Sequence, residues 1–165
     1  MHGVPFIWPP NNIMTKPKTQ LGIQIAELFK EQGDNYTLIS SAKEYDNFQV
    51  TIEDHQAINI VCHAYPNLAH GILIHTRSIY PVLIANNIPE FLHATNDANL
   101  KSTSVTTAVE ISNDKQAFTI HFKSFIPFEQ NADISPLFDD ALKLHRQEVK
   151  QVILPCFKNI KMEVN

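Results

Sequence analysis

The chain has 165 residues, of which 44% are hydrophobic and 18% are charged, and its formal net charge is −4. This length and composition predict one globular domain with a single core and exclude an intrinsically disordered chain. The lysines and arginines form no cluster, which argues against a nucleic-acid partner. No apolar run approaches the roughly 18 residues that a membrane span needs.

The cysteine content and the amino-terminal sequence provide evidence on the cellular compartment of the protein. Cys62 and Cys156 are too few for a disulfide framework, so we expect two reduced thiols. The amino terminus lacks the basic and apolar regions of a secretory signal. We therefore expect a cytoplasmic protein.

Residues 1–17 differ from the rest of the chain, because they hold four of the ten prolines and the only tryptophan. Proline fixes φ and removes a backbone donor, so this segment is predicted to be an extended arm. One interpretation is an unfolded leader, with Met14 as a natural start. The other is an arm that places Phe6 and Trp8 in a groove of this or a neighbouring subunit. A single domain is expected over 18–157, followed by a tail over 158–165.

The next segment predicts a helix followed by three or four antiparallel strands. Leu21, Ile25 and Phe29 share a helical face after Thr19, and Gly33 is placed to end the helix. Alternation of apolar and polar residues then predicts strands at residues 36–40, 48–52, 58–63 and 71–75.

A second helical region is expected after Arg77. Pro81 and Pro89 could each open a helical turn, since proline is tolerated in a first turn. Ile88 and Phe91 belong to the apolar face of this region, and residues 96–99 form its polar exit.

The last third of the chain predicts a β-hairpin. One strand is expected over residues 104–111, a polar turn over 112–115, and a second strand over 117–123. Phe118, Ile120 and Phe122 alternate with polar residues, so they should share a buried face.

A closing helix is expected over residues 136–154. Ser135 reads as the N-cap and Pro136 as the first helical residue, with Asp139 in the first turn beside Asp140. Pro155 should end the helix. We expect the apolar faces of hairpin and helix to pack together, through Phe118, Ile120, Phe122, Leu142 and Val149.

The order of elements is therefore α-β-β-β(-β)-α-β-β-α. The order contains no regular strand–helix–strand alternation, which a parallel sheet would require. The economical packing is an α+β fold in which an antiparallel sheet carries its helices mainly on one face.

The run Ile88-Pro89-Glu90-Phe91-Leu92, then Asn96 and Asn99, then the hairpin and closing helix resemble a known family. It is the YbjN-type bacterial sensory-transduction-regulator domain, whose fold is shared with type III secretion chaperones. The resemblance implies a non-enzymatic, often dimeric domain that binds other proteins. It assigns no functional residue to this chain.

The residues predict no metal, cofactor or catalytic site. The eight histidines include no pair at a spacing of three or four, which a helical metal site needs. Folding could still gather His63 and His121 on adjacent strands, whereas His145 is expected to be a hydrogen-bonded packing residue. The four glycines fit no phosphate-binding motif, and G-x-S-x-G is absent.

Two functional interpretations remain. The first is a non-enzymatic protein-binding module, chaperone-like or regulatory, which acts through a homodimer or a protein partner and binds neither nucleic acid nor membrane. The second is a small-ligand-binding protein or a hydrolase with a pocket between sheet and helices, built on His63, His121 and a carboxylate. For the first, aromatic residues are the candidate exposed contacts: Phe6, Trp8, Tyr65, Tyr80, Phe125 and Phe128.

Overall fold

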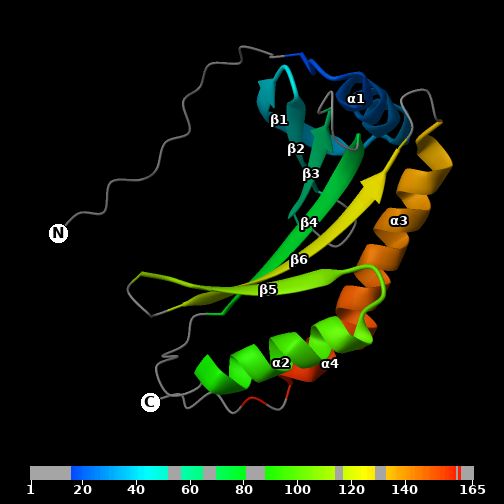
Figure 1. Ribbon diagram of the computed structural model, residues 1–165. Helices are drawn as coiled ribbons and strands as arrows, with labels where there is room; N and C mark the ends of the chain where they lie inside the picture. The colour runs from blue at the N-terminus through cyan, green and yellow to red at the C-terminus, as the bar shows by residue number, and fades with distance from the viewer. Residues whose placement is uncertain are drawn as a thin grey trace.

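The computed structural model (Figure 1) describes residues 16–51, 57–64, 70–80, 88–113, 117–128, 133–158 and 160. The arm at residues 1–15 lies outside this description. The elements are α1 (Gln20–Gln32), β1 (Asn35–Ala42), β2 (Tyr45–Thr51), β3 (Ala57–His63), β4 (Gly71–Tyr80), α2 (Ile88–Lys101), β5 (Thr106–Ile111), β6 (Phe118–Pro127), α3 (Ser135–Glu148), a π-helical segment (Val149–Ile153) and α4 (Leu154–Phe157). The predicted α+β class and element order are confirmed.

The six strands form one antiparallel sheet in the order β1-β2-β3-β4-β6-β5. Strands β1 to β4 follow one another, and β6 then pairs with β4 so that β5 becomes an edge strand. The longest pairing joins β4 and β6, because Gly71–Tyr80 pairs with Phe118–Pro127 over its full length.

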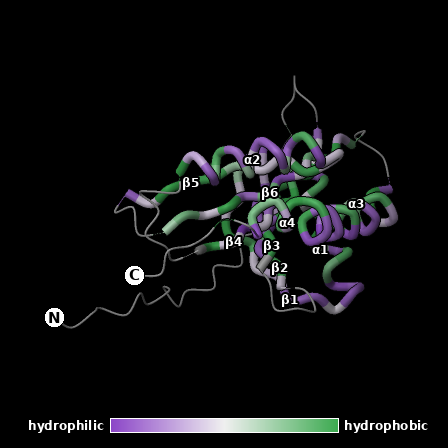
Figure 2. Tube along the Cα trace, turned by 90° about the horizontal axis from the view of Figure 1, so that it is seen from below, coloured by the Kyte–Doolittle hydropathy of each residue, from purple (hydrophilic) through white to green (hydrophobic). Residues whose placement is uncertain are grey.

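All helices pack on the same face of the sheet. Residues of one parity, such as Ile74 on β4 and Ile120 on β6, are fully buried. In Figure 1, α1 and α3 lie beside the sheet and α2 and α4 lie beneath β5. Figure 2 shows hydrophobic and hydrophilic residues alternating along the turns of α2 and α3, as expected for helices with one buried side. The other face of the sheet carries no described helix.

The core consists of two apolar clusters. The first joins α1 and β1–β4 to the start of α3 and includes Phe29, Phe48 and Phe138. The second joins α2, β6 and the π-helical segment. Phe118, Ile120, Phe122 and Val149 pack in the second cluster as predicted, whereas Leu142 packs against the first.

Helix α1 has a cap at each end. The Thr19 hydroxyl accepts a hydrogen bond from the Gly22 amide at 2.9 Å, and Gly33 ends the helix in the left-handed region with φ 74°. The buried carboxylate of Asp46 accepts hydrogen bonds from the amides of Lys18 at 3.0 Å and Thr19 at 2.8 Å. Burial alone would raise the pKa of Asp46, but these bonds and one from Ser41 outweigh it and lower the pKa.

Strands β4 and β6 extend well beyond the ends predicted for them. Helix was expected after Arg77, but β4 continues to Tyr80 and α2 begins at Ile88. The reason is pairing with a distant segment, because Ile79 and Tyr80 complete the ladder opposite Thr119 and Phe118. Strand β6 likewise continues to Pro127.

The closing helix also differs from its prediction at both ends. Ile134, rather than Ser135, is the N-cap and provides no side-chain hydrogen bond, while the Ser135 amide donates to Asp133 at 3.1 Å. Asp139 lies beyond the first turn and accepts from Gln32 at 3.1 Å. Asp140, predicted to lie in the same first turn, also lies beyond it.

The helical path does not end before Pro155. The Leu154 amide donates to the carbonyl of Val149, five residues earlier, which defines the π-helical segment. In this wider turn each amide bonds the carbonyl five residues earlier, and the turn lies directly before Pro155, which has no N–H to donate. The chain therefore continues through α4 to Phe157.

Glu148 joins the closing helix to the link between α2 and β5. Its buried carboxylate accepts hydrogen bonds from the Ser102 hydroxyl at 2.6 Å, from the amides of Ser104 and Val105 at 3.1 Å each, and from Thr103. Burial opposes ionisation, but these donors outweigh it and lower the pKa of Glu148 to about 2.

Among the described residues, no helix combines the length and hydrophobicity that crossing a membrane requires.

Ile120→Ala tests the register of the core. Ile120 is fully buried in the second cluster, so the change should lower the free energy of unfolding by about 2–5 kcal/mol through lost transfer energy and a cavity. Ile79→Ala is the matched control, because Ile79 is 59% exposed on the adjacent strand and should cost less than about 1 kcal/mol. Chemical denaturation measures both, and equal losses would contradict the register.

Glu148→Gln tests the carboxylate contact. Glutamine keeps the shape but loses the charge, so the free energy of unfolding at pH 7 should fall by about 1–3 kcal/mol. Because the pKa of Glu148 is lowered from 4.5 to about 2, its contribution is complete above pH 4.5 and disappears as pH falls towards 2. The difference between wild type and variant should therefore shrink at low pH. Glu27→Gln, on the exposed side of α1, is the control.

Candidate functional site

The uncovered face of the sheet carries the exposed apolar side chains of the strands. Ile39 is 40% exposed, Tyr45 36%, Ile79 59% and Phe125 48%. They belong to β1, β2, β4 and β6 and have the parity opposite to the buried residues. Sequence analysis selected only Phe125 among them. The alternation around Phe48 and Ile74 could have identified Tyr45 and Ile79.

The predicted aromatic contacts have different outcomes. Phe125 lies on the uncovered face, and its ring covers Gly71, where an added Cβ would be 2.3 Å from the Phe125 ring. Phe128 was expected to be exposed, and this is wrong: it is 7% exposed and packs in the first cluster, because its amide bonds the His70 carbonyl at 2.9 Å. Phe6, Trp8 and Tyr65 lie outside the described residues. Tyr80 ends β4, but its side chain is outside the description.

A chain of hydrogen bonds joins two histidines and a carboxylate on the uncovered face. His75 Nε2 lies 2.9 Å from His121 Nδ1, and His121 Nε2 lies 2.9 Å from Glu110 Oε2. If His121 Nε2 donates its proton to Glu110, then Nδ1 accepts from His75. The pKa of His75 falls to about 4, mainly through burial and then through electrostatic interaction with His121, Lys123 and Arg77.

The possible juxtaposition of His63 and His121 on adjacent strands does not occur. His63 lies on β3 and His121 on β6, and β4 separates these strands. His75, on β4, takes the place next to His121. Within the part of the chain that the structure describes, no group of three or more histidine, cysteine or carboxylate side chains is arranged to hold a metal ion.

His145 is a buried packing residue, as predicted. It is 1% exposed, and its Nε2 lies 2.8 Å from the Thr76 hydroxyl while its Nδ1 lies 2.7 Å from that of Ser124. Burial, and then the nearby His75, lower the pKa of His145 to about 4 despite the opposing effect of Glu148. The imidazole is therefore neutral at pH 7 and joins β4, β6 and α3.

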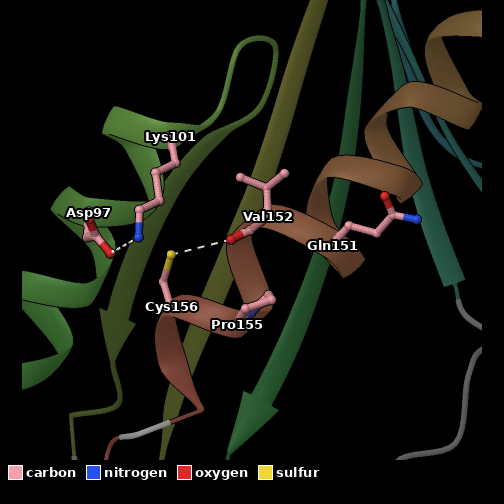
Figure 3. Close-up of a pocket in the computed structure, with 6 residues that line it drawn as sticks. All are labelled: Asp97, Lys101, Gln151, Val152, Pro155 and Cys156. Atoms are coloured by element: carbon pink, nitrogen blue, oxygen red, sulfur yellow. Dashed lines mark hydrogen bonds and ion pairs between the residues drawn. The ribbon is translucent and has the colours of Figure 1, made fainter.

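A pocket of about 390 Å³ lies between α2 and the segment that follows α3 (Figure 3). Lys101 and Asp97 form an ion pair of 2.7 Å on one side, and the Cys156 thiol donates to the Val152 carbonyl at 3.3 Å on the other. Burial raises the pKa of Cys156, which opposes formation of a nucleophilic thiolate. The Cys156 thiol in this pocket therefore resists ionisation.

A second pocket, also of about 390 Å³, opens at the amino end of α1 and includes Lys18, Lys43 and His70. The amides of Lys18 and Thr19 at this helix end already bind Asp46. Neither pocket contains the histidine and carboxylate chain of the uncovered face.

Comparison with known proteins shows similarity at the level of the fold. No protein-family model and no curated protein matches the sequence. The fold is similar to a solved structure described as "Crystal structure of YbjN, a putative transcription regulator from E. coli", with a TM-score of 0.52. The match covers 81% of this chain and 88% of YbjN at 10% sequence identity. At this identity the similarity shows a YbjN-like fold.

The pH dependence of stability tests the buried neutral His145. Because its folded pKa is about 4, below the unfolded value near 6.5, unfolding takes up a proton between these values and stability falls as the pH is lowered through this window. His145→Met should reduce this slope by up to about 1.4 kcal/mol per pH unit. Urea denaturation at several pH values gives the slope. Measurement at pH 8 isolates the packing cost, and an unchanged slope would contradict a neutral His145.

Proposed function

We propose that this chain is a non-enzymatic protein-binding module, chaperone-like or regulatory, that works in the bacterial cytoplasm. The observation that carries the proposal is the uncovered sheet face, where Tyr45, Ile79 and Phe125 are exposed on three different strands. Apolar side chains that are exposed on the same face of a sheet are typical of interaction sites. The YbjN-like fold supports a regulatory role, since YbjN is described as a "putative transcription regulator".

The occupant of this face is a protein partner or a second copy of the chain. Aromatic residues suit such contacts because they bury much area at small entropic cost. Of the aromatic set, Phe125 is exposed on this face. Phe6, Trp8, Tyr65 and Tyr80 remain proposed contacts, and Phe128 is no longer one because it is buried.

Replacing both Tyr45 and Ile79 by serine tests the proposal. The double variant should weaken homodimerisation, or capture of a copurifying partner, by about tenfold or more, because it removes exposed apolar area at both ends of the uncovered face. Sedimentation at micromolar concentration and affinity capture with mass spectrometry provide the readouts. Both side chains are partly exposed, so the fold should survive.

Leu137→Ser combined with Leu144→Ser is the matched control. Both leucines are exposed on α3, away from the uncovered face, at 53% and 44%. This control should associate like the wild type. A strictly monomeric wild type whose serine variants retain every partner would contradict the proposal.

A further inference from the structure

On the uncovered side of the β4–β6 pair, apolar and basic side chains are aligned along the two strands. The register sets them opposite one another in three pairs, Leu73 with Phe125, His75 with Lys123, and Arg77 with His121. Ile79 follows on β4. We call these seven residues the β4–β6 row. It runs from an apolar end through a basic centre to a second apolar end, and its length is about 20 Å because alternate strand residues lie about 6.7 Å apart.

The basic centre has charge available for binding. Arg77 and Lys123 are both exposed, and neither forms an ion pair within the described residues. Glu110 is the nearby carboxylate on this face, and it already bonds His121. Both cations also act on His75, since each contributes to lowering its pKa, after burial and His121. The two cations therefore lie close enough to act together on one ligand.

The chemistry of the row favours carboxylates over other anions. Arginine matches the two oxygens of a carboxylate in a planar, bidentate contact, and lysine adds a point charge beside it. A nucleic acid would need many phosphate contacts, whereas this row offers two permanent cations on a chain of net charge −4. A second copy related by two-fold symmetry would place the same basic centres close together, where like charges repel.

The flanking residues define the rest of the ligand. Leu73 and Phe125 at one end and Ile79 at the other provide apolar surface on both sides of the cations, and Phe125 and Ile79 are 48% and 59% exposed. An extended segment presents every second side chain to one face, with the same spacing as the row. Such a segment would need apolar, acidic, acidic and apolar residues at alternate positions.

We propose that the β4–β6 row binds an extended acidic segment of a partner protein, with carboxylates at Arg77 and Lys123 and apolar side chains at Phe125 and Ile79. This rests on the proposed protein-binding function and assigns the chemistry of the partner. The contact is electrostatic at its centre, so it weakens as salt is added.

A labelled peptide tests the assignment directly. The probe is a fluorescein-labelled peptide, capped at both ends, in which phenylalanine, two glutamates and leucine alternate with serines. Fluorescence anisotropy should show saturable binding to the full chain below about 1 mM peptide, and lysines in place of the glutamates should abolish it. Rising sodium chloride should weaken the binding.

Charge reversal locates the contact. Arg77→Glu combined with Lys123→Glu should lower peptide affinity by about tenfold or more, because both attractions become repulsions. Lys143→Glu combined with Lys150→Glu makes the same change in net charge at exposed positions on the helical side and should bind like the wild type. Circular dichroism checks that each variant is folded. If the charge-reversed variant does not fold, Arg77→Gln combined with Lys123→Gln takes its place.

Several results would overturn the assignment. The wild type does not bind the peptide, the charge-reversed variant binds it as tightly as the wild type does, or the helical-side control loses as much peptide affinity as the charge-reversed variant. Tighter binding of an oligothymidylate at the same salt, lost on charge reversal, would make the partner a nucleic acid. Dissociation of a wild-type dimer on charge reversal would make it a second copy. If the peptide fails while the Tyr45 and Ile79 serine variant still loses its partner, this inference fails and the proposed function stands.

Discussion

The closing helix is held by two buried polar residues, and the arrangement of the two apolar clusters depends on them. His145 binds hydroxyls on β4 and β6, and Glu148, one turn later, binds the link between α2 and β5. A buried histidine or carboxylate without partners would cost several kcal/mol, so the helix has one favourable position against the sheet. Apolar packing alone tolerates small shifts, whereas these directed contacts do not. The helix consequently connects both clusters in one register.

Placing every described helix on one face leaves the sheet with two chemically different sides. The buried side is rich in phenylalanine and isoleucine, with a few polar residues such as Thr76 and Ser124. The uncovered side mixes apolar residues with Arg77, Lys123 and the His75–His121 pair, so it is neither a second core nor an ordinary solvated surface. Gly71 lets the Phe125 ring approach the backbone of β4 on that side, where an added Cβ would lie 2.3 Å from the ring. The fold thus leaves one broad face of the sheet with exposed apolar and basic side chains.

The sequence predicts what depends on neighbours along the chain and misses what depends on distant strands. Alternation at Phe118 and Phe122 correctly predicts their burial, because a strand's period is local. The extension of β4 beyond Arg77 and the burial of Phe128 depend on pairing with segments about 40 to 60 residues away. His75 meets His121 because β6 pairs with β4, which no spacing within the sequence encodes. The same limit applies to the candidate site, whose residues come from separate strands.

The contact between Asp46 and the start of α1 also constrains how the chain folds. Lys18 and Thr19 bind a carboxylate that lies 27 or 28 residues later, on β2. Gly22 is required beside it, because a Cβ there would be 2.1 Å from an Asp46 oxygen. The first turn of α1 is therefore complete only after the β1–β2 hairpin has brought this carboxylate into place. Helix α1 and the hairpin should consequently form as one cooperative unit, in which neither element reaches its full stability before the other.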